Sequence, residues 1–274
     1  MKITMGCRLL VAVLVASTSP VLATAPADPC RAPDDVAGAV AALPKVAAVL
    51  KPRAVLDILA IGSATMFGPE ATLAPGTVTM QSLGAGPAAT EAKVFNKAAS
   101  DRAFPMQMAA ALRNAVPGMD VRVTVRGGRS LLATDMLRLM RAELEAKRYD
   151  LVLWQTGTVE AVRNVPPGEF GQTLSDGAEA VLASGANLVL VDPQYSRFLQ
   201  TNSNVEPYEQ GLQQIAAMPG VVLFRRYDLM RTWVNESQID LERTPRAERD
   251  KVIETLHACL GKHLARFVLE SARS

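Results

Sequence analysis

The chain has 274 residues, enough for one α/β domain or two small ones, and 49% of them are hydrophobic while only 5% are aromatic. This composition excludes a disordered chain and is typical of a globular protein rich in Ala, Val and Leu. The 29 basic residues exceed the 27 acidic ones by two, and Lys2 and Arg8 account for that excess. A balanced charge over the rest of the chain argues against a nucleic-acid or anionic-membrane partner held by bulk charge.

The first 25 residues have the pattern of an export signal. Two basic residues form a positively charged start, residues 9–16 are apolar, and Ala23-Thr-Ala25 fits a small-residue cleavage site. The apolar part is too short to span a bilayer as a stable helix, and an uncleaved anchor is the alternative. We predict that residues 1–25 are removed and that residues 26–274 form one domain without a membrane span. The mature protein is then expected to be periplasmic or secreted.

Two of the three cysteines remain after the signal is removed. Cys7 lies before the apolar part, whereas Cys30 and Cys259 lie near the two ends of the mature chain. An even count in an oxidising compartment favours a disulfide that ties the N-terminal arm to the last helix. Two buried free thiols are the alternative.

Strands and helices alternate along the chain. Apolar runs predict strands at residues 55–61, 121–125, 149–155, 186–191 and 221–224. Amphipathic spacing predicts helices at residues 35–50 (interrupted at Pro44), 101–115, 131–148, 166–184, 204–217, 227–235 and 246–270. This alternation predicts one α/β domain with three α/β/α layers and a five-stranded, mostly parallel sheet. Residues 68–100 form a long polar connection, in which residues 77–83 have the pattern of a short hairpin.

The first strand leads into the turn where function is expected. Residues 55–61 are continuously apolar and end at Gly62, which indicates a strand buried on both faces. Open α/β sheets place their sites in the turns that follow such strands, so Gly62-Ser-Ala-Thr65 is the candidate turn. The sequence has no Gly-x-Gly-x-x-Gly or Walker pattern. We therefore expect no nucleotide and no other cofactor.

Five segments share the pattern of one enzyme family. They are Ile58-Leu-Ala-Ile-Gly-Ser63, Arg126-Gly-Gly128, Asp150-Leu-Val-Leu-Trp-Gln-Thr-Gly-Thr158, Val189-Leu-Val-Asp-Pro-Gln-Tyr195 and Ala258-Cys-Leu-Gly261. Through them the chain from Cys30 to its C-terminus resembles the SGNH (GDSL-like) hydrolases, in particular exported bacterial members. The resemblance implies an SGNH/flavodoxin-like fold and an ester-hydrolase site. That site consists of a nucleophilic Ser, an oxyanion hole that includes a Gly amide and an Asn, and an Asp-x-x-His pair.

Most of these catalytic positions are substituted in this chain. Ala64 occupies the nucleophile position and Ser63 the position before it, while Gly128 matches the family glycine. Val159 stands where the family has Asn, and Lys251 stands where it has His. Glu160 follows Val159, Glu248 takes the place of the Asp, and no Asp-x-x-His occurs anywhere. Ester hydrolysis needs a base to take the serine proton and preplaced donors for the oxyanion, so the resemblance implies a degenerate site.

Three residues are candidates for a rebuilt site. Ser63 is a relocated nucleophile, or a turn hydroxyl bonded to backbone that points away from Ala64 because side chains alternate along a strand. His257 is a relocated base, or a packed or capping residue in an apolar helix. Lys251 is a base, or one of several charges on a solvated face. His263 is expected at the surface, and two histidines at this spacing do not make a metal site.

Other polar residues are expected to line the cleft. Thr65, Arg129, Thr158 and Glu160 follow predicted strands and are the candidates. Glu160 is a carboxylate in the cleft or the partner of Arg129 or Arg163. Asp192 is expected in a strand-end turn, and Trp154 in the core.

These observations leave three hypotheses. The first is an exported SGNH-family pseudoenzyme that binds a ligand or partner at the cell envelope, such as an acylated carbohydrate or an envelope protein. The second is a working esterase or deacetylase that uses Ser63, with His257 or Lys251 as base and Gly128 as oxyanion donor. The third is a structural protein that uses residues 68–100 as an interaction loop.

Overall fold

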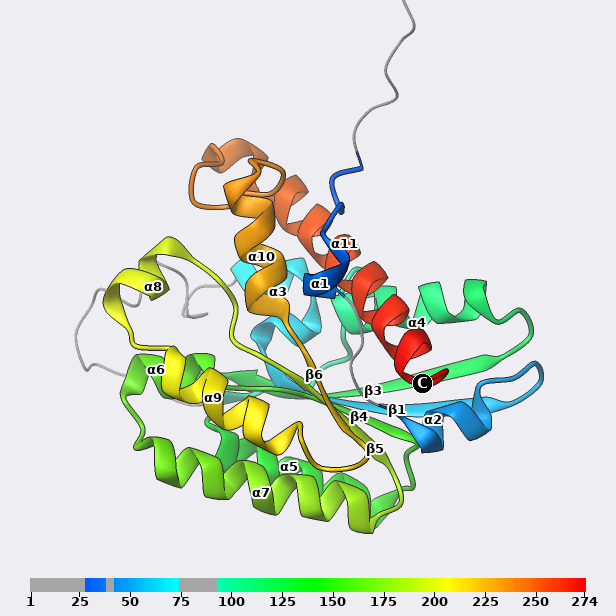
Figure 1. The fold of residues 1–274 in the computed structure, drawn as a ribbon. Helices are drawn as coiled ribbons and strands as arrows, with labels where there is room; N and C mark the ends of the chain where they lie inside the picture. Colours follow the sequence, from blue (N-terminus) through cyan, green and yellow to red (C-terminus); the bar gives the residue numbers. More distant parts are fainter. Residues whose placement is uncertain (1–27, 38–41, 74–92) are drawn as a thin grey trace, which may run out of the picture.

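The protein is described by a computed structural model that covers residues 28–37, 42–73 and 93–274. The expected signal segment and the hairpin at residues 77–83 lie outside the described residues. A six-stranded sheet with strand order β2-β3-β1-β4-β5-β6 forms the middle layer (Figure 1). Its parallel strands are β1 (Val55–Ser63), β3 (Asp120–Arg129), β4 (Leu151–Gln155), β5 (Asn187–Val191) and β6 (Val221–Phe224). The predicted three-layer α/β/α fold is confirmed.

The sixth strand, β2 (Lys93–Val94), was not predicted from the sequence. It pairs antiparallel with the end of β3, opposite Gly128 and Arg129. Two residues are too few for a recognisable alternating pattern, so the strand depends on its partner. That partner is also longer than expected, because residues 126–129 continue β3 instead of forming a turn.

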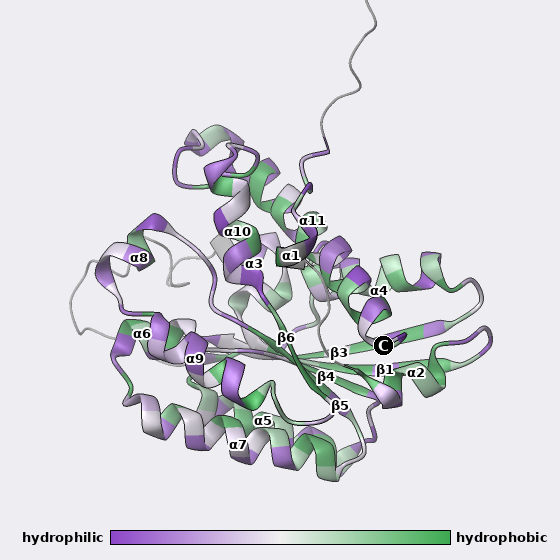
Figure 2. Cartoon of the chain, viewed as in Figure 1, coloured by the Kyte–Doolittle hydropathy of each residue, from purple (hydrophilic) through white to green (hydrophobic). Residues whose placement is uncertain are grey.

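Helices cover both faces of the sheet (Figure 1). One face carries α5 (Ala133–Ala146), α7 (Pro167–Ala183) and α9 (Glu206–Ile215), and the other carries α4 (Phe104–Ala115) and α11 (Arg249–Ser271). The remaining helices are α1 (Asp34–Ala37), α2 (Pro44–Val49), α3 (Pro69–Leu73), α6 (Thr158–Arg163), α8 (Arg197–Asn202), α10 (Arg226–Asn235), η1 (Ala64–Phe67) and η2 (Arg246–Glu248). In Figure 2 the strands are hydrophobic while α7 and α9 alternate between hydrophobic and hydrophilic residues, as expected for helices with one solvated side. None of the described helices combines the length and the apolar character that a membrane span requires.

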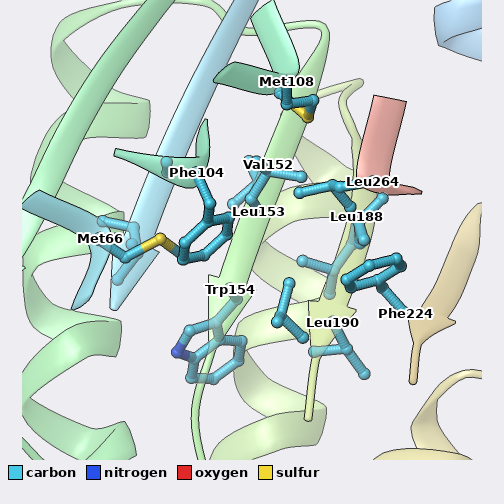
Figure 3. Close-up of a cluster of buried hydrophobic side chains, with 14 of the residues drawn as sticks. Met66, Phe104, Met108, Val152, Leu153, Trp154, Leu188, Leu190, Phe224 and Leu264 are labelled. Carbon is cyan, nitrogen blue, oxygen red and sulfur yellow. The ribbon is translucent and has the colours of Figure 1, made fainter. Parts of the chain in front are cut away.

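The core lies on both faces of the central strands. Every residue of β4 and β5 is buried, and Figure 3 shows Met66 and Phe104 lying against each other beside β4. Trp154 is completely buried, as expected, and packs under α7 at Gly177. A Cβ at Gly177 would stand only 2.3 Å from Trp154 Cζ3, so this helix approaches the sheet as closely as a glycine permits.

A disulfide ties the N-terminal arm to the last helix. Cys30 and Cys259 are bonded across 229 positions of sequence, which confirms the predicted pair. The Trp233 Nε1–H donates to the Arg31 carbonyl at 2.9 Å, and a ring nitrogen of His263 hydrogen-bonds with the Cys30 carbonyl. His263 is therefore buried and not at the surface as the sequence suggested, because the arm covers its face of α11.

Two glycines of α7 test how tightly this helix packs. We expect Gly177→Ala to lower the free energy of unfolding by about 1–3 kcal/mol, because its methyl group overlaps the Trp154 ring. Gly171→Ala is the matched control in the same helix, where an added Cβ meets nothing within 4 Å. It should raise the free energy of unfolding by about 0.5–1 kcal/mol through helix propensity. Urea unfolding followed by circular dichroism measures both, and equal effects would contradict the packing described here.

Reduction tests the disulfide. The closed loop is long, so we expect loss of the bond to cost about 2–5 kcal/mol of unfolding free energy. The measurement is the unfolding midpoint with and without dithiothreitol. The double variant Cys30→Ala/Cys259→Ala should unfold near the midpoint of the reduced protein and should not respond to the reductant. If dithiothreitol leaves the unfolding midpoint of the wild type unchanged, the disulfide does not contribute the expected stability.

Candidate functional site

A small cavity lies at the carboxyl ends of β1 and β4. Its volume is about 30 Å³, above the roughly 10–15 Å³ that one water molecule requires. The described lining residues are Ser63, Ala64, Thr65, Arg129, Ser130, Gln155, Thr158, Val159 and Gln194. We call this the edge cavity. It lies where open α/β sheets place their ligands.

Three side chains of the edge cavity form a closed ring of hydrogen bonds. Thr65 Oγ1 donates to Gln155 Oε1 at 3.0 Å, and Gln155 Nε2 donates to Ser63 Oγ at 2.9 Å. Ser63 Oγ and Thr65 Oγ1 are 3.0 Å apart. A threonine hydroxyl has one proton, and that of Thr65 already goes to Gln155, so Ser63 is the donor in the third bond. The Ser63 hydroxyl is thus hydrogen-bonded to side chains. The sequence-based alternative of a turn hydroxyl had placed this bond on the backbone.

Ser63 and Ala64 both line the edge cavity, although alternation along a strand predicts that their side chains point to opposite sides. The expectation assumed that the strand alternation continues through both residues. Instead β1 ends at Ser63 and the 3-10 helix η1 begins at Ala64, so the chain has already turned. Both the family's nucleophile position and the residue before it therefore border the same small space.

Gly62 makes the ring possible. A Cβ at this position would stand 2.9 Å from Gln155 Cβ and 2.8 Å from Met66 Cγ. Real Cβ atoms do not approach so closely, so only glycine lets Gln155 lie beside the end of β1. The 3% exposed Gln155 then satisfies its polar atoms within the ring.

Gly128 lies inside the sheet. It pairs with Ser63 of β1 on one side and with Val94 of β2 on the other. A Cβ at Gly128 would stand 1.9 Å from the Lys93 carbonyl oxygen, so the added strand covers this residue closely. The proposed oxyanion donor is thus next to Ser63 in register, while the described lining of the edge cavity does not include it.

His257 serves α4. Its Nδ1 accepts the Phe104 N–H at 3.1 Å, at the first residue of that helix. Burial, with a smaller contribution from the charge of Arg226, lowers the pKa of His257 to about 4. The ring is therefore neutral at pH 7 with its proton on Nε2, so Nδ1 is occupied as an acceptor and Nε2 has no lone pair for a proton. His257 is a packed, capping residue, and the described lining of the edge cavity does not include it.

Two further candidates lie apart from the ring. Lys251 is exposed near the start of α11. Glu160 is 1% exposed, and its carboxylate accepts the backbone N–H of Ala133 at 2.5 Å and of Gly157 at 2.9 Å. Burial raises the pKa of Glu160 against these hydrogen bonds. The side chain joins the N-termini of α5 and α6 instead of facing a ligand.

Arg129 provides the charge of the edge cavity. It lines the cavity together with Thr65 and Thr158, the other predicted lining residues. Its Nε is buried and has no hydrogen-bond partner in the described part of the chain. An unpartnered buried N–H is unusual because it loses its hydration without compensation. Arg129 is therefore the one charged residue of the described lining, and it has a buried donor without a partner.

A larger cavity of about 240 Å³ lies beside the disulfide. Its described lining includes three cations, but Lys262 pairs with Asp28 at 2.7 Å, and Arg266 pairs with Asp34 at 2.8 Å and with Glu270 at 2.6 Å. Its charges are thus largely matched within the protein. Among the described residues, no group of three His, Cys, Asp or Glu side chains could hold a metal ion.

The sequence reasoning did not select Gln155, Ser130 or Gln194, although all three line the edge cavity. Gln155 and Gln194 both lie in segments that carry the family resemblance, and Gln155 is the last residue of a buried strand. A polar residue at that position is the signal that would have identified it. Ser130 gave no comparable signal; in the structure it follows the end of β3 directly and has a left-handed backbone conformation (φ 55°).

Comparison with known proteins identifies the family and the fold. A sequence model of the non-GDSL lipase-like family matches residues 29–274. No curated protein sequence matches the chain. Among solved structures, a two-domain esterase active on acetylated mannans is 12% identical with a TM-score of 0.56 and covers 86% of this chain and 55% of its own. A lipase/acylhydrolase from Enterococcus faecalis is 12% identical with a TM-score of 0.51 and covers 77% of this chain and 94% of its own.

The burial of His257 predicts that the free energy of unfolding depends on pH. Its pKa of about 4 in the folded protein lies below the ordinary value of 6.5, so the unfolded chain binds more protons between these values. We expect His257 to cost the folded state on the order of 3 kcal/mol as pH falls from 6.5 to 4. In His257→Asn, which keeps an acceptor for the Phe104 N–H, this part of the loss should disappear. Urea unfolding at pH 4.5 to 7 measures the free energy of unfolding of both proteins. If it falls equally with pH in wild type and His257→Asn, the prediction is wrong.

Proposed function

This chain belongs to the non-GDSL lipase-like family, and from that premise we propose that it is a non-catalytic member that binds a ligand at the edge cavity. The observation that carries the proposal is the closed ring of Ser63, Thr65 and Gln155. The esterase fold supplies the position of a site, and this ring occupies the position with hydroxyl and amide groups alone.

The ring supports a binding role because it gives Ser63 no base. A serine attacks an ester only when a neighbouring group removes its proton. Here the proton of Ser63 goes to the neutral hydroxyl of Thr65. If the Gln155 amide were reversed, the proton would go to an amide oxygen, which is no better as a base. The described lining contains no histidine, lysine or carboxylate that could replace either.

The other groups that a hydrolase requires are also occupied or replaced. His257 accepts a hydrogen bond from the Phe104 N–H of α4, and Val159 stands where the resemblance places the asparagine of the oxyanion hole. Loss of nucleophile, base and asparagine together leaves none of the triad chemistry. The substituted positions and the bonded state of Ser63 therefore point in the same direction.

We further propose that the protein works outside the cytoplasm. The export pattern of residues 1–25 supports this, and the Cys30–Cys259 bond agrees with it, since disulfides persist in oxidising compartments. An acylated carbohydrate or a cell-envelope protein is the partner we propose. A two-domain esterase of similar fold is active on acetylated mannans, which supports an acylated carbohydrate as the ligand.

Labelling with a fluorophosphonate serine probe tests the absence of catalysis. We expect no labelling of the folded mature protein, because Ser63 donates its proton to a hydroxyl and is not activated. Hydrolysis of p-nitrophenyl acetate should likewise be the same for wild type and Ser63→Ala.

The lipase/acylhydrolase from Enterococcus faecalis can serve as the positive control for the probe, and circular dichroism establishes that the unlabelled protein is folded. Labelling that disappears in Ser63→Ala would overturn the proposal. It would instead establish a working esterase with a rebuilt site.

A further inference from the structure

The edge cavity contains one formal charge, that of Arg129. The other described lining residues are serines, threonines, glutamines, Ala64 and Val159, so no carboxylate in the lining offsets it. The nearest acidic residue in sequence to the lining, Glu160, is buried and bonded to backbone amides. The guanidinium thus faces a small polar space without a counterion among the described residues.

The hydrogen-bonding groups around Arg129 are donors without acceptors. Its Nε–H is buried and unpartnered. The Thr158 hydroxyl oxygen accepts the Gln194 N–H at 3.3 Å, so its own proton remains to be donated. For neither that proton nor the Ser130 hydroxyl does the described part of the chain provide an acceptor. The cavity therefore presents several donors to whatever enters it, which is the complement of an anion.

The size and charge of the cavity favour a carboxylate over a larger or more highly charged anion. A volume of about 30 Å³ admits only a small group, and the rest of a ligand would lie outside, over the partly exposed Ser63, Thr65 and Gln194. A planar guanidinium matches a planar carboxylate with paired N–H···O bonds. A phosphate would bring up to two negative charges to a single cation.

We propose that the edge cavity is a carboxylate-binding site and that Arg129 is its specificity-determining residue. The carboxylate belongs to a small organic acid or to an acidic sugar. The Arg129 guanidinium pairs with the carboxylate, and the hydroxyls of Ser130 and Thr158 donate to the same group. This inference rests on the proposed function, because it treats the cavity as a place where a ligand stays and does not react.

The test is a titration of the 15N-labelled mature protein with acetate and with D-glucuronate, followed by 1H–15N NMR. We expect both to shift the Arg129 Nε–H resonance, and acetamide, the neutral isostere of acetate, to leave it unchanged. Tighter binding of glucuronate than of acetate would assign the acidic sugar as the source of the carboxylate, and equal binding would assign the small acid. No shift with either acid, or tighter binding of inorganic phosphate, would overturn the proposal.

Variants separate the charge of Arg129 from a general effect of basic residues. Arg129→Gln should weaken acetate binding about tenfold or more, because a charge-assisted hydrogen bond is lost. Arg129→Lys keeps the charge but not the paired geometry, so its affinity for acetate should lie between those of the wild type and Arg129→Gln. Arg122→Gln is the matched control, since Arg122 lies on the same strand but is exposed and pairs with Asp120. Equal affinity of Arg129→Gln and Arg122→Gln would overturn the proposal.

Serine labelling keeps this inference separate from the proposed function. If the probe does not label the protein and acetate causes no NMR shift, only the carboxylate site is refuted. A protein that is labelled at Ser63 refutes the non-catalytic function, whatever its response to acetate. The acetate and acetamide titrations use the wild-type protein, so they decide the question even if Arg129→Gln does not fold.

Discussion

The close approach of β1 and β4 at Gly62 determines the chemistry at this edge of the sheet. Because Gly62 has no Cβ, Gln155 reaches both hydroxyls that follow β1 and holds them in one ring. A buried amide must have its hydrogen bonds, so the ring is a structural requirement once Gln155 is there. The side chain that fills this edge of the sheet is thus also the one that hydrogen-bonds the Ser63 hydroxyl.

Most of the buried ionisable groups discussed above hydrogen-bond backbone amides. Acidic and basic groups near the site are used to hold the helices: Glu160 joins α5 to α6, and Asp192 accepts the Tyr227 N–H of α10 at 2.8 Å. His257 does the same for α4 in its neutral form. These groups are buried and committed to backbone amides, which leaves Arg129 as the one charged member of the described cavity lining. The described lining at this edge of the sheet is therefore polar with a single cation.

The sequence predicted the layers, the five parallel strands and the disulfide, because long apolar runs and regular helical spacing carry that information. It failed where one element depends on another. β2 exists only because β3 continues beyond its apolar part, and His263 is buried only because a distant arm covers it. Ser63 and Ala64 share a cavity because η1 begins between them, which alternation along a strand cannot show. Of the cavity itself, Thr65, Arg129 and Thr158 were predictable from their positions after strands, whereas the ring required knowledge of which strands are neighbours.

The disulfide also constrains the order in which the molecule can be completed. During synthesis Cys30 emerges 229 residues before Cys259, so the arm has no partner until almost the whole domain has been made. The final helix must then lie along the sheet before the two sulfur atoms can meet. A chain that stops before α11 would have the whole sheet and the edge cavity residues, but its arm would lack this covalent link and Cys30 would lack its partner. Covalent closure therefore requires that the chain as far as Cys259 has been made and that α11 lies in its place.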